Sequence, residues 1–364
     1  MKFSHVFLGL LALSLPSVAA DNFDWLRDDS RQDERVLSYL KKQNQKTEQF
    51  QKSYDEITQH LLSQWEAMVA EKGDKPWVIK NGQEWNLTRR QGNFVLLSRA
   101  DKNAQENVVY DFSSRQEERQ YFQIGQWRIQ DDSLLFTEDI DGSEQYHAVL
   151  VELNNGRVHE LISNVDNGVL LSPNGKFAFA VSKEAKTQRP YQIVRINTQT
   201  NEQKVLWQED KTDWLMSFYP AADARFALVQ SNNESTTEQK ILNLDSGELT
   251  ASLRKPEPGV EYYADVAQDR VFINSNLNGQ FGLFETEMPE KDVNTVESNW
   301  KSFLRSENGL EQFYLYEAGL VALTKQDNQT TISVYSYDGK AKKNASVRVG
   351  RASCLVEHSW RLPL

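Results

Sequence analysis

Near the N-terminus, apolar residues recur at steps of three or four, which is the spacing of one face of an α-helix. They are Phe50, Tyr54, Ile57, Leu61, Trp65 and Met68. An earlier helical pattern begins after Asp33, a residue suited to cap a helix, and carries Val36, Leu37 and Leu40. Gly73 and Pro76 end the pattern. We therefore predict an amphipathic helical segment from residue 33 to about residue 72.

From Trp77 onward the period changes, and short apolar runs alternate with turns rich in Asn, Asp and Gly, as expected for strands. One apolar strand repeats as NFVLLS (from Asn93), DSLLFT (Asp132), GKFAFAVS (Gly175), ARFALVQS (Ala224), DRVFINS (Asp269) and AGLVALT (Ala318). Successive starts are 39, 43, 49, 45 and 49 residues apart. Four copies are followed by a polar turn, an alternating strand and a closing turn, and Asn276–Glu287 is a plainer copy.

A repeat of roughly 40–50 residues with about four strands is typical of a β-propeller blade. A β-sandwich requires no fixed period of this length. We count six blades, the first of them partial. An open ring of six would expose two sheet edges, so we expect a seventh blade or a rearranged sixth. The predicted fold is all-β, a β-propeller over residues 77–344 preceded by a helical arm over residues 21–76.

The first twenty residues, MKFSHVFLGLLALSLPSVAA, have the pattern of a cleavable signal peptide. Lys2 supplies the positive start, an apolar run follows, and small residues precede Ala20. The run is too short to span a bilayer. We predict cleavage after Ala20, a mature chain that starts at Asp21, and export to the periplasm. Cys354 is the only cysteine, so the chain cannot form an internal disulfide.

The chain has 364 residues, 39% hydrophobic and 26% charged, with a net charge of −11. This apolar content suffices for a sizeable core. The acidic balance argues against nucleic acid as a partner, because phosphate binding needs a basic face. No later segment is apolar for long enough to be a membrane helix.

The sequence contains no recognisable nucleophile centre. There is no Gly-x-Ser-x-Gly elbow, and Ser172–Lys176 (SPNGK) is expected to be a hairpin turn. The histidines are His5, His60, His147, His159 and His358, each of which is expected to be a surface or strand residue. His159–Ser163 (HELIS) starts like a zinc-protease helix, but a serine stands where the second histidine is required.

The carboxylates also favour a structural interpretation. Glu138, Asp139 and Asp141 precede Gly142 but lack the spacing of a calcium loop, so we predict a hairpin turn. The pairs Asp131–Asp132 and Glu117–Glu118 would point to opposite faces of a strand, a poor geometry for acid–base catalysis. We give no functional weight to the glycosylation-like sequons at Asn86, Asn233, Asn328 and Asn344. We therefore predict no catalytic, cofactor-binding or metal-binding residue in this chain.

The segment FDWLRDDSRQDERVLSYLKKQN, from Phe23, resembles the N-terminal sequence of oligopeptidase B, a branch of the prolyl oligopeptidase family of serine peptidases. Further similar stretches follow in order: DGSEQY from Asp141, RPYQIVR from Arg189, GVEYYADVAQDRVFINSN from Gly259 and GQFGLFETEM from Gly279. The resemblance covers roughly residues 22–340. The opening segment and RPYQ-x-x-R are its most specific parts.

This resemblance implies a seven-bladed propeller that covers an α/β-hydrolase peptidase domain and admits only short or unfolded peptides. It implies that the helical arm packs along that peptidase domain, and that the complete enzyme cleaves after Arg or Lys. The triad of that family lies in the peptidase domain, and no position here matches it.

The sequence is compatible with two functions. In the first, the chain is the substrate-gating propeller of an exported oligopeptidase B-like peptidase, inactive alone. In the second, it is a stand-alone periplasmic propeller that binds peptides or a protein partner, with acidic turns such as Asp139–Glu144 attracting basic peptides. The oligomeric state is left open.

The divergent tail, residues 345–364, holds Cys354 and lacks strand alternation. The last blade therefore looks incomplete. We expect a frameshift or premature stop there, the alternative being a divergent terminus that closes the ring.

Overall fold

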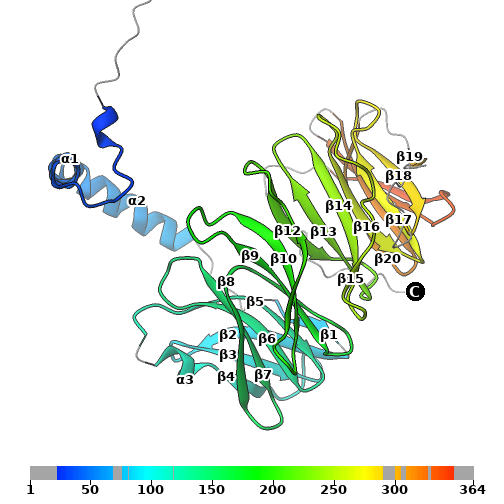
Figure 1. The fold of residues 1–364 in the computed structure, drawn as a ribbon, viewed down its shortest axis with the longest axis horizontal. Helices are drawn as coiled ribbons and strands as arrows, with labels where there is room; N and C mark the ends of the chain where they lie inside the picture. The colour runs from blue at the N-terminus through cyan, green and yellow to red at the C-terminus, as the bar shows by residue number, and fades with distance from the viewer. Residues whose placement is uncertain are drawn as a thin grey trace, which may run out of the picture. The chain divides into compact units, whose positions relative to one another are not determined.

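The computed structural model describes residues 23–68, 76–80, 82–117, 119–289, 300–304, 309–326 and 329–347. The chain forms two compact units, residues 1–76 and residues 77–364 (Figure 1), which are described separately. The expected signal peptide and the expected tail beyond residue 347, including Cys354, lie outside the described residues.

The first unit contains η1 (Asp24–Leu26), α1 (Glu34–Lys52) and α2 (Asp55–Met68). The predicted cap is confirmed, because the Asp33 carboxylate accepts hydrogen bonds from the backbone N–H groups of Arg35 and Val36 at 2.8 and 3.4 Å. Trp25 contacts α1 at the edge of the Tyr39 ring, with a centroid distance of 5.1 Å, and lies under the Arg35 guanidinium. The opening segment therefore folds back onto the first turns of its own helix.

The helical segment is interrupted where the sequence predicted continuity. α1 ends at Lys52, and α2 starts at Asp55 in a different direction (Figure 1). The hydroxyl of Ser53 donates to the carbonyl of Phe50 at 2.7 Å, closing the last turn of α1. Asp55 and Glu56 then provide the acidic first turn that favours a new helix. In the described part of the chain, no helix is both long and apolar enough to cross a membrane.

The second unit consists of antiparallel sheets that follow one another along the chain (Figure 1). The first sheet contains β1 (Val78–Lys80), β2 (Gln83–Arg90), β3 (Asn93–Arg99) and β4 (Asn107–Asp111). A short helix, α3 (Ser113–Gln116), leads to a seven-stranded sheet. That sheet contains β5 (Gln123–Gln130), β6 (Ser133–Asp139), β7 (Tyr146–Glu152), β8 (Arg157–Leu171), β9 (Phe177–Lys183), β10 (Pro190–Asn197) and β11 (Gln203–Gln208).

Three four-stranded sheets complete the unit. The next sheet contains β12 (Leu215–Pro220), β13 (Phe226–Asn232), β14 (Thr237–Asn243) and β15 (Glu248–Leu249). It is followed by the sheet of β16 (Tyr262–Ala267), β17 (Arg270–Ser275), β18 (Gly282–Glu287) and β19 (Lys301–Leu304). The last sheet contains β20 (Leu310–Tyr316), β21 (Gly319–Gln326), β22 (Gln329–Tyr335) and β23 (Ala341–Val347).

The seven-stranded sheet is two blades joined by one long strand, β8. The first part of β8 pairs with β7, as in Glu152↔Arg157, and the last part pairs with β9, as in Leu171↔Ala178. Val165 pairs with both neighbours, so the outer strand of the second blade continues into the inner strand of the third. The described residues thus form six blades of four strands each, and the seventh blade stays a prediction.

The repeated apolar strand is the second strand of every blade except the first, where it is the third. The true second strand there, β2, reads QEWNLTRR and is too polar to match the repeat. The first blade is therefore complete, and the expectation that it is partial was wrong. The sixth blade also has four strands, although its last strand, AKKNASV, lacks apolar alternation. It belongs to the sheet through backbone pairing with β22.

Five apolar clusters hold the blades together, one between each pair of consecutive blades. Alternate side chains of one strand enter different clusters: Leu134 and Phe136 of β6 pack towards the first blade, whereas Leu135 packs towards the third. A central strand is therefore buried on both faces, which explains the continuous apolar runs of the repeat.

Candidate functional site: the blade junctions

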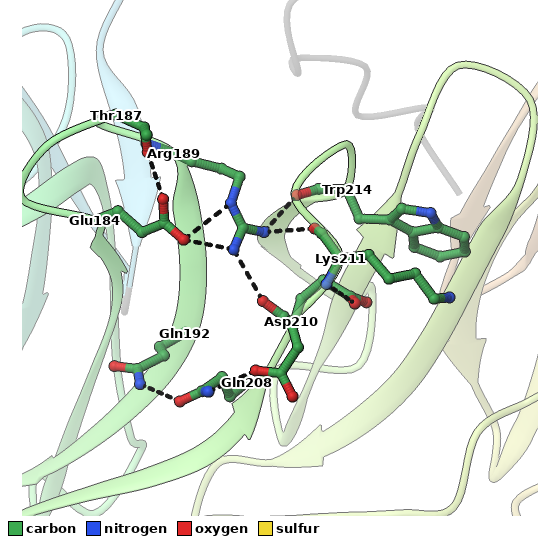
Figure 2. Close-up of polar contacts among 9 residues, drawn as sticks. Glu184, Thr187, Arg189, Gln192, Gln208, Asp210, Lys211 and Trp214 are labelled. Carbon is green, nitrogen blue, oxygen red and sulfur yellow. Dashed lines mark hydrogen bonds and ion pairs between the residues drawn. The ribbon is translucent and has the colours of Figure 1, made fainter.

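The junction between the third and fourth blades is closed by the buried guanidinium of Arg189 (Figure 2). Arg189 ends the β9–β10 turn, and its side chain reaches the 209–214 connection that leads from β11 to β12. It donates to the carbonyls of Lys211, Trp214 and Glu209 at 2.8, 2.9 and 3.1 Å. One side chain thus satisfies three backbone acceptors of the 209–214 connection.

A carboxylate orients this guanidinium within its own turn. Arg189 donates to Oε1 of Glu184 at 2.7 Å, and the Thr187 hydroxyl donates to Oε2 at 2.5 Å. These hydrogen bonds, that of Arg189 first, hold the pKa of Glu184 below its ordinary value. Figure 2 shows both contacts on the side of Arg189 opposite the connection. Arg189 lies in the RPYQ-x-x-R stretch, so the resemblance marked this residue, but its clamping role was not predicted.

The 209–214 connection also contains a buried acid, Glu209. Its carboxylate accepts the backbone N–H of Lys211 at 2.9 Å and the hydroxyl of Ser231, on β13, at 2.8 Å. Gln192, Gln208 and Asp210 form a more exposed row of hydrogen bonds, drawn in the lower part of Figure 2. The connection is thereby fixed to both the third and the fourth blade.

The junction between the first and second blades uses the opposite arrangement, a buried carboxylate held by two arginines. Glu138 on β6 is 1% exposed. It accepts from Arg115 and Arg119, which lie in and just after α3. The hydrogen bond from Arg115 to Glu138 raises the pKa of the guanidinium. Because a buried charge requires a partner, this pair holds the segment between the blades in place.

The junction between the fourth and fifth blades is neutral. The amide of Gln239, which is fully buried on β14, donates to the Tyr219 hydroxyl at 2.9 Å and accepts the N–H of Ala264 at 2.9 Å. The Tyr219 hydroxyl in turn donates to the Ala264 carbonyl at 2.8 Å. Nearby, burial raises the pKa of Asp265 to about 6. These residues were not predicted from the sequence, although an isolated Gln within an apolar strand indicates a buried hydrogen bond.

The histidines do not form a catalytic pair with a serine hydroxyl among the described residues. His60 is exposed on α2 beside Gln64, and His159 on β8 contacts Glu152 at 2.9 Å. His147 lies on β7, and His5 and His358 lie outside the described residues. His159–Ser163 belongs to β8 and is a strand, so the zinc-helix interpretation is excluded.

The two predicted turns are confirmed. The Asp139 carboxylate accepts backbone N–H groups of Asp141, Gly142 and Glu144, so it holds the β6–β7 loop. Ser172–Lys176 closes β8 onto β9 with Gly175 at a positive φ. Asp131 and Asp132 form the β5–β6 turn rather than lying within a strand. Within the described ranges, no group of three or more His, Cys, Asp or Glu residues could hold a metal ion.

Consecutive four-stranded meanders, packed face to face through apolar clusters, define this protein as a β-propeller. Over residues 14–361 the chain matches the family described as "Prolyl oligopeptidase, N-terminal beta-propeller domain". The chain therefore belongs to that family. The resemblance seen in the sequence is confirmed at this level.

Two curated relatives are peptidases of about twice the length. The chain is 22% identical to dipeptidyl aminopeptidase BI of Pseudoxanthomonas mexicana over 88% of this chain and 48% of the relative. It is 24% identical to protease 2 of Moraxella lacunata over 88% of this chain and 51% of the relative. The chain thus spans about half the length of the curated relatives that it matches.

Solved structures with the same fold include oligopeptidase B from Leishmania major, with a TM-score of 0.73 and 18% identity, covering 89% of this chain and 48% of that one. Oligopeptidase B from Trypanosoma brucei with covalently bound antipain gives a TM-score of 0.72 and 16% identity, covering 88% and 47%. At these identities the likeness establishes the fold.

Proposed function

We propose that this chain is the substrate-gating propeller of a serine peptidase of the prolyl oligopeptidase family. The observation that carries the proposal is the family match over nearly the whole chain, together with coverage of only about half of each peptidase relative. The junction clamps support this role, because a gate must keep its blades in register while peptides pass. In this proposal hydrolysis belongs to a separate α/β-hydrolase domain, and the propeller alone does not catalyse.

The helical arm is proposed to dock on that peptidase domain. The side chains of Phe50, Trp65 and Met68 are 66%, 58% and 73% exposed. Exposed apolar side chains that share one helix face, as Trp65 and Met68 do on α2, are typical of an interaction surface. The resemblance of the arm to oligopeptidase B implies packing of this segment along the peptidase domain.

Two finer properties belong to the same proposal. The resemblance of the opening segment and of RPYQ-x-x-R to oligopeptidase B supports cleavage after Arg or Lys. The pattern of residues 1–20 supports export to the periplasm. Export is tested by N-terminal sequencing of the protein recovered from a periplasmic fraction. A mature start at Asp21 is expected, and an intact Met1 in the cytoplasmic fraction would overturn the export proposal.

Catalysis is tested with the purified 364-residue chain and fluorogenic peptides that carry Arg or Lys before the scissile bond. We expect no turnover above the blank. Turnover that a serine-directed inhibitor abolishes would show that the chain carries its own nucleophile, and the gating proposal would fail.

Docking is tested by mixing the chain with the peptidase domain of protease 2, expressed without its propeller, and measuring complex formation by light scattering. The double substitution W65E/M68E is expected to weaken the complex, since it places charge on the apolar face. The matched control is Gln59→Glu, which lies on the opposite face of α2 and should leave the complex unchanged. Equal loss with both variants would refute docking through the apolar face, as would no complex with the unmodified chain.

A further inference from the structure

A cavity of about 340 Å³ lies between the inner strands of the first two blades. β1 contributes Val78 and Lys80 to its lining, and β5 contributes residues 125–129. The cavity belongs wholly to the second unit. None of its lining residues takes part in the junction clamps described above, so those clamps leave it unexplained.

Two cations line this cavity without a matching acid. Lys80 donates from Nζ to the Ile129 carbonyl, and Arg128 donates to the Trp127 carbonyl and to Oε1 of Gln126, both at 2.8 Å. In the described part of the chain, neither cation forms an ion pair with a carboxylate. A lysine has three N–H donors and an arginine has five. The three hydrogen bonds above use three of these eight donors, and the others are available to a ligand.

The electrostatic setting agrees with this geometry. Burial, followed by the charge of Arg128, lowers the pKa of Lys80, and the opposing effect of Asp131 is smaller. Burial alone lowers the pKa of Arg128. Two partly desolvated cations that line one cavity repel each other, and an anion bound in that cavity would relieve the repulsion. Because the protein as a whole has a net charge of −11, an anion is attracted to this locally cationic cavity rather than to the rest of the protein.

The walls add an apolar surface beside the cations. The Val78 side chain is 53% exposed, and the half-buried Trp127 packs against the cluster between the first two blades. A ligand that fits both features carries a carboxylate next to an apolar group. The last residue of a peptide has this chemistry, and the cavity volume suits one or two residues.

We propose that this cavity binds the C-terminal carboxylate of a peptide, with Lys80 and Arg128 holding the carboxylate and with the last side chain against Val78 and Trp127. The choice of a peptide over another carboxylic acid rests on the proposed function. The binding itself is a property of the propeller and needs no peptidase domain.

Calorimetric titration of the full chain tests the proposal with four probes: N-acetyl-Ala-Leu, its C-terminal amide, 4-methylpentanoate and inorganic phosphate. The free peptide acid should bind at least roughly tenfold more tightly than the amide, since the neutral amide cannot accept charge-assisted hydrogen bonds from Lys80 and Arg128. Equal binding of acid and amide, or no binding of the acid, would refute the carboxylate site. Equal binding of 4-methylpentanoate or phosphate would refute the assignment to a peptide terminus.

Variants separate the site from a loss of folding. Lys80→Gln and Arg128→Gln should each weaken binding of the peptide acid by roughly tenfold, whereas Lys204→Gln, an exposed lysine on β11, should bind as the unmodified chain does. The urea midpoint of each variant is measured alongside, and Arg128→Lys serves where Arg128→Gln fails to fold. Unchanged affinity in both site variants would overturn the proposal. Because no step uses peptidase activity, failure of the gating proposal and failure of this one are distinguishable.

Discussion

Replacement of Arg189 by Met tests whether one side chain fixes the junction between the third and fourth blades. Met keeps much of the volume of the aliphatic stem but cannot donate hydrogen bonds. The change leaves the carbonyls of Glu209, Lys211 and Trp214 without their side-chain donor. At about 1 kcal/mol of net stabilisation for each hydrogen bond, the expected loss is about 3 kcal/mol of unfolding free energy.

The assay is urea denaturation followed by tryptophan fluorescence, to which the buried Trp214 contributes. For a unit of this size a urea m-value of about 3 kcal/mol/M is expected, so the midpoint should fall by about 1 M. Glu184→Gln separates the two halves of the clamp. It removes the carboxylate charge but leaves the three carbonyl contacts, so its midpoint should lie close to that of the unmodified chain.

The matched control is Arg157→Met, an exposed arginine on β8 whose loss should not move the midpoint. Equal midpoints for Arg189→Met and Arg157→Met would refute the clamp. A larger loss for Glu184→Gln than for Arg189→Met would show that the ion pair, and not the capture of the carbonyls, stabilises the junction.

Three further predictions follow from the same structure. Gly125→Ala would place a Cβ 2.4 Å from Oγ1 of Thr137 and should lower the free energy of unfolding, measured by urea denaturation, by about 1–3 kcal/mol. At Gly168 the atom nearest to an added Cβ is 3.5 Å away, so Gly168→Ala should be tolerated. Equal losses for the two variants would contradict the packing argument. Burial raises the pKa of Asp265 from 3.8 to about 6, so the folded state holds its proton more tightly and stability falls as pH rises from about 4 to 6. Asp265→Asn should remove up to about 3 kcal/mol of that fall, and an unchanged pH profile of the urea midpoint would refute it. Asp33→Ala should cost about 1 kcal/mol of cap energy, seen as roughly fivefold faster hydrogen exchange in the first turn of α1; equal exchange in that variant and the unmodified chain would contradict the capping geometry.

The blades could be predicted from the hydrophobic period and the turn residues, because a central strand is buried on both faces. Runs such as SLLFT and GKFAFAVS predict buried strands by themselves, without reference to the strands that pair with them. Strands with a polar sequence were not predicted. β2 and β23 belong to their sheets through backbone pairing, which leaves little trace in the side chains. The break between α1 and α2 was not predicted for a related reason: the apolar stripe continues through it, and no Gly or Pro lies at the break.

The junctions could be predicted only in part. Arg189 stands within a stretch marked by the resemblance, yet nothing in the sequence pairs it with a connection some twenty residues further on. Glu138 was interpreted with Asp139 and Asp141 as part of one turn. In the structure only the two aspartates serve the turn, while Glu138 on the opposite face of β6 binds two arginines. Strand alternation separates neighbouring carboxylates, but their partners depend on packing.

The sequence by itself determined the helical arm, the repeating strands and the propeller class, because helix and strand periods and turn residues are local properties of the chain. Tertiary structure alone decided how blades share a strand in β8, which polar side chains close the junctions, and that Lys80 and Arg128 line one cavity. Those features join residues that are far apart in the sequence, and their energies arise from desolvation on packing. No local pattern records them.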